Sequence, residues 1–186
     1  MTLTVDIQRA TAEPVPDEDD IRRWIDAALA GHRDGQDTEI ALRLVDREEM
    51  TALNGQYRGK PRPTNVLSFP SDLPAELGLP LLGDMVICAP VVAEEARAQH
   101  KSDAAHWAHL CVHGTLHLLG YDHIEDSEAE AMEALETRVL AGLGYPCPYT
   151  VTDASTDTNN RTDTAQPPRP DRSGTTADTA KEHSPQ

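Results

Sequence analysis

The chain has 186 residues, 38% of them hydrophobic, which fits one domain with a real core. Its 32 acidic residues outnumber 16 basic ones and give a net charge of −16, so any contact with nucleic acid must be local or must draw its affinity from a partner. We find no run of about 18 apolar residues and no leader-like N-terminus, and therefore expect neither a membrane span nor a secretory signal. Three widely spaced cysteines favour reduced thiols in a cytoplasmic protein.

The elements of the first 55 residues follow from the spacing of apolar side chains. Alternation of apolar and polar residues predicts strands, and apolar residues three and four apart predict helices. Asp46 with Glu49 resembles a capping box at a helix start, and Gly55 would end that short helix. In chain order we expect a strand at residues 3–7, a helix at 17–31, a strand at 38–45 and a helix at 46–55.

A basic segment, Tyr57 to Pro63, follows this helix. Its two prolines and its glycine predict an irregular loop. Three cations, Arg58, Lys60 and Arg62, lie within it. A solvated loop would explain them, but in so acidic a chain they favour contact with a phosphate. Arg58 is the best candidate, because a guanidinium can hold a phosphate through two hydrogen bonds.

The remaining patterns complete an α+β fold. Residues 84–88 are nearly all apolar, which predicts a central strand. Acidic residues of the last helix, among them Glu136, are expected to form a solvated face. In chain order we expect a strand at residues 64–69, a loop at 71–82, a strand at 84–88 and helices at 90–99, from 102–103 and from a capping box at 127–130. A mixed, roughly four-stranded sheet should therefore pack with about five helices.

Residues 1–150 should form this single domain, and residues 151–186 should form a disordered C-terminal tail. The tail is rich in Thr, Asp, Ser, Pro and Arg. Its few apolar residues cannot bury enough surface to offset the entropy that ordering would cost.

A histidine pair in the penultimate helix predicts a metal site. His113 and His117 are four residues apart, which places them on one helix face about 6 Å apart along the axis. Gly120 would end the helix in a left-handed conformation, and the resulting reversal can bring His123 to the same ion. Three nitrogen ligands with an open position describe a catalytic zinc site, whereas structural sites close with four protein ligands. Histidines that merely pack on an amphipathic helix are the alternative explanation.

Neighbouring residues refine this hypothesis. Zinc peptidases carry a glutamate directly after the first histidine, where this chain has Gly114. We interpret this glycine as providing room beside the metal. His106 and His109 precede the ligands by one to two turns and are expected either to orient the ligands or to be packing residues. Asp122 would either accept a proton or orient a ligand imidazole.

Four segments are similar to motifs of the YbeY family of bacterial metal-dependent endoribonucleases. They are His113–His123, Leu53–Lys60, Pro63–Pro70 and Leu82–Asp84. The resemblance implies a zincin-like fold with one zinc ion, held by His113, His117 and His123, and an important role for Arg58. It further implies cleavage of single-stranded RNA, maturation of the 16S rRNA 3′ end and late ribosome quality control with the small subunit and its assembly factors. Neither DNA nor a membrane is an implied partner.

Two other functions are compatible with the residues alone. A zinc peptidase would explain the metal spacing but lacks its base at Gly114. A ribosome-assembly binding protein with a structural metal would explain the family motifs without catalysis. In the nuclease hypothesis, the metal is a Lewis acid that also activates water, Arg58 stabilises phosphate charge, and Lys60 and Arg62 add weaker RNA contacts. A 2′-hydroxyl could instead be the nucleophile.

Overall fold

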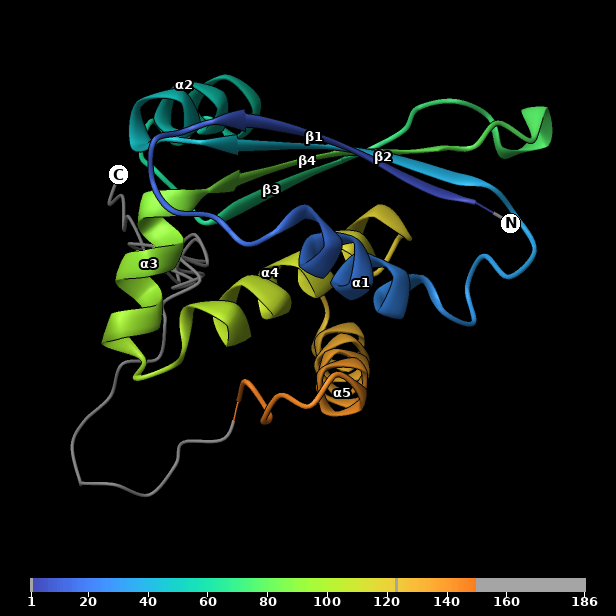
Figure 1. Cartoon of the computed structure of the whole chain (residues 1–186). Helices are drawn as coiled ribbons and strands as arrows, with labels where there is room; N and C mark the ends of the chain where they lie inside the picture. Colours follow the sequence, from blue (N-terminus) through green and yellow to red (C-terminus); the bar gives the residue numbers. More distant parts are fainter. Residues whose placement is uncertain (1, 123, 150–186) are drawn as a thin grey trace, which may run out of the picture. The chain divides into compact units, whose positions relative to one another are not determined.

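The computed structural model of the chain describes residues 2–122 and 124–149. His123 and the predicted tail at residues 151–186 lie outside these described residues. The strands are β1 (Leu3–Ala10), β2 (Thr38–Val45), β3 (Val66–Pro70) and β4 (Leu81–Cys88). The helices are α1 (Glu18–Leu29), α2 (Arg47–Arg58), α3 (Ala89–Ala98), α4 (Asp103–Leu118) and α5 (Asp126–Gly142), with a 3₁₀ turn at Ala75–Leu77. The predicted α+β class is confirmed (Figure 1).

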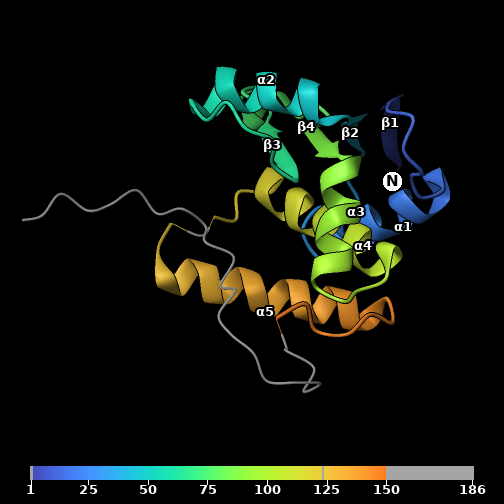
Figure 2. The ribbon, with the colours of Figure 1, turned by 90° about the vertical axis from the view of Figure 1, so that its left-hand side faces the viewer.

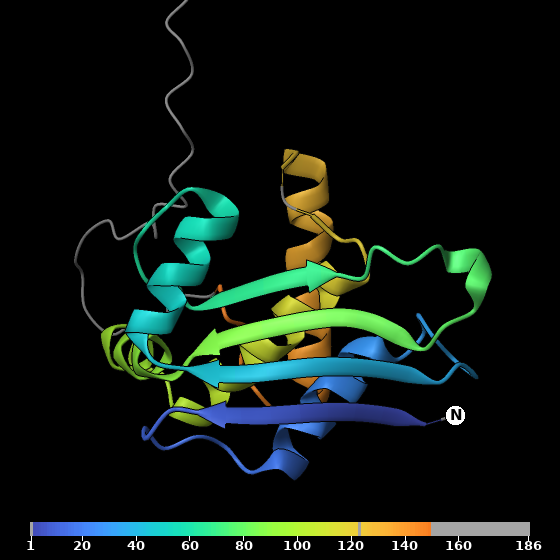
Figure 3. The ribbon, with the colours of Figure 1, turned by 90° about the horizontal axis from the view of Figure 1, so that it is seen from above.

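The four strands form one mixed sheet in the order β1-β2-β4-β3. β1, β2 and β4 are parallel, and β3 runs antiparallel to β4 at the edge (Figure 3). Parallel neighbours need long crossover connections, which the segments containing α1 and α2 supply. The predicted central position of the strand at residues 84–88 is confirmed, because β4 has a neighbour on each side.

Helices cover both faces of the sheet, and α4 contacts most of the other elements. On one face, α4 packs against β3 and β4, and it also contacts α1, α3 and α5 (Figures 1 and 2). Its side chains Trp107, Cys111 and Leu116 belong to the larger hydrophobic core. On the other face, Met50 of α2 packs with Leu67 of β3 in a smaller core. The histidine helix is therefore held on several sides.

The helix predicted at residues 46–55 is longer than expected. α2 continues through Tyr57 and Arg58 and ends at Gly59, whose φ of 67° is left-handed. Gly55 therefore lies inside the helix, where a Cβ would meet Pro61 at 3.4 Å. The predicted stop at Gly55 and the predicted loop start at Tyr57 are both wrong, because glycine also occurs where another segment approaches a helix closely.

Two predicted capping boxes are absent. Asp46 precedes α2, but its carboxylate accepts a hydrogen bond from Thr11 rather than from the helix. Glu49 pairs with Arg43 of β2. α5 begins at Asp126, so Ser127 lies inside the helix instead of capping it. For Asp46 and Glu49, partners elsewhere in the chain replace the expected contacts with the helix backbone. No helix among the described residues is long and apolar enough to cross a membrane.

Candidate metal centre

Both ends of α4 form as the sequence predicts. At its start, the Ser102 hydroxyl accepts a hydrogen bond from the Ala105 amide at 3.1 Å. At its end, Gly120 has a φ of 101°, which favours glycine, and its amide donates to the His117 carbonyl at 3.0 Å. The chain reverses here. Three residues later comes His123, which lies outside the described residues.

His113 and His117 face one another across a single helical turn. Their Nε2 atoms are 3.0 Å apart and their ring centroids 4.5 Å apart. Two nitrogens bound tetrahedrally to one zinc ion lie about 3.3 Å apart, given Zn–N bonds of about 2.0–2.1 Å. The His113 side chain is 25% exposed, so solvent reaches this pair. The two imidazoles are therefore arranged to bind one ion that stays accessible from outside.

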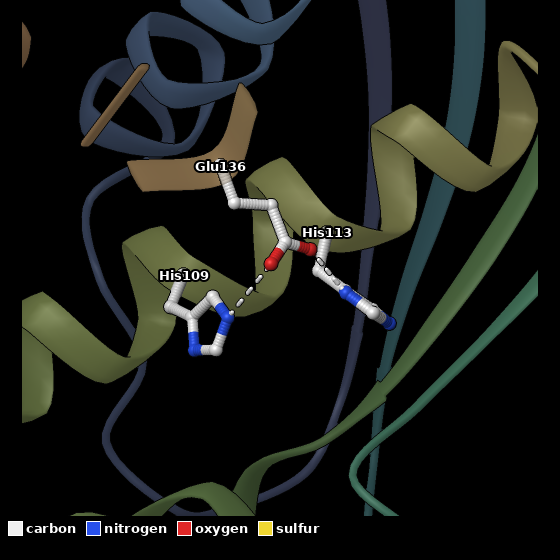
Figure 4. A group of neighbouring side chains, drawn as sticks. All are labelled: His109, His113 and Glu136. Atoms are coloured by element: carbon white, nitrogen blue, oxygen red, sulfur yellow. Dashed lines mark hydrogen bonds and ion pairs between the residues drawn. The ribbon is translucent and has the colours of Figure 1, made fainter. Parts of the chain in front are cut away.

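Behind this pair lies a buried carboxylate from α5. Glu136 accepts a short hydrogen bond from Nδ1 of His113, and its other oxygen lies 3.5 Å from Nε2 of His109 (Figure 4). The Tyr149 hydroxyl donates a further short hydrogen bond to Glu136. Burial alone would raise the pKa of Glu136, but its two histidine partners outweigh burial and hold that pKa at about 2. Glu136 is thus a buried, ionised hydrogen-bond acceptor.

The prediction that Glu136 belongs to a solvated face is wrong, since its side chain is 0% exposed. Sequence spacing contained a signal for this burial. Glu136 stands four residues from both Met132 and Leu140, which are the buried apolar residues of the same helix. A glutamate in the middle of an apolar stripe has to find a polar partner inside the protein.

His109, His113 and Glu136 also form a group whose ligand atoms lie within 4.8 Å of one another and could hold a metal. Their geometry is better explained by hydrogen bonding. The contact between His113 Nδ1 and Glu136 is shorter than the roughly 3.3 Å that separates two ligands of one zinc ion. Burial lowers the pKa of His109, which favours a neutral imidazole beside Glu136.

His106 lies deeper along α4 and is 2% exposed. Its Nε2 is 3.2 Å from a carboxylate oxygen of Glu95, which also accepts a hydrogen bond from Asn65 at 3.1 Å. This network joins α4 to α3 and to the start of β3. His106 thus packs in the protein interior, as expected for a histidine that does not bind the metal.

Gly114 provides room for the sheet, which differs from our expectation that it provides room beside the metal. A Cβ at this position would stand 2.9 Å from Met85 Sδ and 3.2 Å from Ser68 Oγ. The Ser68 hydroxyl donates to the Gly114 carbonyl at 3.1 Å. The glycine therefore permits a close approach of α4 to β3 and β4, between the two histidines.

The basic residues belong to the last turn of α2 and to the segment that follows it. Arg58 is in the last turn of α2, and α2 covers the face opposite α4 (Figure 1). Arg58, Lys60 and Arg62 are all exposed. The neighbouring Tyr57 packs on Phe69 of β3 with ring centroids 5.0 Å apart. The edge strand β3 therefore contacts α4 and, through Phe69, the Tyr57 ring near the end of α2. Asp122 is half-buried beyond the end of α4.

Comparison with known proteins gives concordant results. Residues 6–144 match the family model described as Endoribonuclease YbeY. Endoribonuclease YbeY of Pseudomonas entomophila (strain L48) is 57% identical over 148 residues, covering 79% of this chain and 93% of that protein. The Pseudomonas putida (strain W619) protein of the same name gives the same values. The solution structure of TM1509 from Thermotoga maritima superposes with a TM-score of 0.50 at 26% identity, covering 74% of this chain and 87% of that one.

Proposed function

The chain belongs to the YbeY family of endoribonucleases, and we propose that it cleaves single-stranded RNA at one zinc ion held by His113, His117 and His123. The observation that carries the ligand set is the 3.0 Å separation of the His113 and His117 Nε2 atoms. His123 is included because it follows the reversal at Gly120. Membership of this family favours an endoribonuclease over the peptidase that metal spacing alone allowed.

Zinc, when bound, supplies a Lewis acid that polarises a phosphoryl oxygen and favours attack by a nearby nucleophile. The protein side chains bind and orient the RNA. Arg58 holds a phosphate through its guanidinium, and Lys60 and Arg62 add weaker contacts from the same exposed segment. Asp122 either accepts the proton of the attacking group or orients a ligand imidazole.

We propose that the natural substrate is ribosomal RNA in the cytoplasm. A net charge of −16 disfavours tight binding to free RNA, so affinity has to come from a few local contacts and from a partner. The small ribosomal subunit with its assembly factors is such a partner. Cleavage at the 3′ end of 16S rRNA and removal of defective ribosomes are the processes that this association would serve.

Zinc content and RNA cleavage of matched variants test the proposal. His113→Ala, His117→Ala and His123→Ala should each lose most bound zinc and most cleavage of a single-stranded RNA. His106→Ala is the control and should keep its zinc, because His106 bonds to Glu95. Arg58→Ala should keep zinc but lose cleavage. Wild-type zinc content in the His123 variant would show that the third ligand is wrong, and wild-type cleavage by all variants would refute the nuclease site.

In cells, sequencing of rRNA ends tests the substrate. Cells that lack the protein should accumulate 16S rRNA with an unprocessed 3′ end. The wild-type protein should restore the mature end, and the His113→Ala variant should not. Mature ends in the deletion strain would refute the proposed substrate.

A further inference from the structure

Glu136 is a carboxylate buried behind the histidine pair and bonded from three directions. Its partners are His113 and His109 of α4 and Tyr149, which follows α5. A buried carboxylate is costly unless hydrogen bonds compensate for the lost water. Only one of these three partners, His113, belongs to the proposed ligand set. The arrangement therefore needs an explanation beyond metal coordination.

The two nitrogens of His113 have different partners. Nδ1 bonds to Glu136, and Nε2 faces Nε2 of His117 at 3.0 Å. An ionised carboxylate can only accept hydrogen bonds, so Nδ1 must carry the proton. In a neutral imidazole, this leaves the lone pair on Nε2, and a metal ion requires that lone pair. The Glu136 contact thus determines which nitrogen of His113 can bind a metal.

The carboxylate is itself fixed in place. One oxygen accepts from His113, and the other accepts from Tyr149 and lies 3.5 Å from Nε2 of His109. Burial, together with the negative charge of Glu136, raises the pKa of Tyr149, so its hydroxyl keeps the proton that it donates. Glu136 cannot rotate away from His113 without breaking these contacts. The α5 segment thereby orients a side chain of α4.

We infer that Glu136 is a positioning residue that keeps the proton of His113 on Nδ1 and presents Nε2 to the metal. This inference rests on the proposed function for the ligand set. A carboxylate hydrogen-bonded to a metal-binding histidine raises the basicity of the imidazole, and loss of such a partner typically reduces metal affinity about 10- to 100-fold. Tyr149 acts one step further away, by orienting Glu136.

Two measurements test this role in the full chain. The first is the zinc dissociation constant of Glu136→Gln, obtained by competition with a chelator. Glutamine keeps the size and one acceptor oxygen, but it removes the charge, and zinc affinity should fall about 10- to 100-fold. Tyr149→Phe should lose less. Glu130→Gln is the matched control, because Glu130 is exposed on the same helix, and it should bind zinc as the wild type does.

The second measurement is ¹⁵N NMR of the histidine side chains in metal-free protein. His113 should carry its proton on Nδ1 in the wild type and in Glu130→Gln, and should populate both tautomers in Glu136→Gln. Circular dichroism and the thermal midpoint in chelator report whether each variant folds. If the larger truncation Glu136→Ala unfolds, Glu136→Gln still gives both readouts.

The outcomes separate this inference from the proposed function. Unchanged zinc affinity and an unchanged His113 tautomer in Glu136→Gln would overturn the role of Glu136, whatever the activity. If the wild-type protein bound no zinc, or His113→Ala bound it equally well, the ligand set would be wrong. The NMR comparison would still decide whether Glu136 holds His113 in the metal-free protein.

Discussion

Replacing Gly114 with alanine should destabilise the fold, although alanine is the better helix former. In a helix interior, alanine is favoured over glycine by about 1 kcal/mol. Against this gain, the new Cβ would stand 2.9 Å from Met85 Sδ and 3.2 Å from Ser68 Oγ. Met85 is only 1% exposed, so it cannot move into solvent. Overpacking of a core costs about 1–3 kcal/mol. We therefore expect a net loss of stability between zero and about 2 kcal/mol.

Urea unfolding in the presence of a chelator measures this change without a contribution from bound metal. Gly55→Ala is the control, because Gly55 is also inside a helix but a Cβ there would lie 3.4 Å from its nearest neighbours. The control should gain up to about 1 kcal/mol. An equal gain in Gly114→Ala would refute the tight contact between α4 and the sheet. Gly114→Glu should destabilise the protein much further, because a larger and charged side chain would enter the same space.

Three further predictions concern other parts of the chain. Ser102→Ala removes the cap of α4 and should lower the free energy of unfolding by about 1 kcal/mol; no change would mean that the cap is dispensable. Glu49→Gln should cost less than about 1 kcal/mol, because both side chains of the Arg43–Glu49 pair are partly exposed to solvent. The hydrogen bond from Arg43 lowers the pKa of Glu49 in the folded protein below its usual value of 4.5. The stability cost of Glu49→Gln should therefore be full at neutral pH, and it should disappear as the pH falls through 4.5 and then through the lower pKa of the folded protein. A cost that does not change with pH would refute this role of the hydrogen bond. Truncation after Thr150 should leave the thermal midpoint and zinc content unchanged, and a large loss of stability would show that the removed residues dock.

Local signals predicted most of the fold and the close approach of two histidines of the candidate site. Alternation gave the boundaries of β2 correctly, because one face of that strand is buried. Ser102 and Gly120 predicted both ends of α4, since a capping hydroxyl and a left-handed glycine act within a few residues. His113 and His117 followed from helix geometry alone.

The errors arise where contacts with residues outside the predicted helix determine the structure. Either Gly55 or Gly59 could end α2 as far as the sequence shows. Gly55 lies inside the helix, where Pro61 packs closely against it, and Gly59 ends the helix. The partner of Glu136 is His113, on another helix, and helical periodicity describes only what happens within one helix. Gly114 likewise depends on strands that precede it in the chain. Sequence patterns predict the elements well, whereas contacts between elements decide these three positions.

The parallel sheet also has a consequence for how the protein folds. Leu3 pairs with Thr38, and Glu39 pairs with Leu81. Each parallel pairing therefore closes a long loop, and the entropy of loop closure is lost before the contacts between the strands can stabilise the pair. Proteins dominated by such non-local pairings fold slowly. α4 can form its first turns locally, but its packing surface on β3 and β4 exists only after the sheet has closed. We expect the helix that carries the histidine pair to be packed in place in the slow phase of refolding, so that full zinc affinity develops only when the sheet has formed.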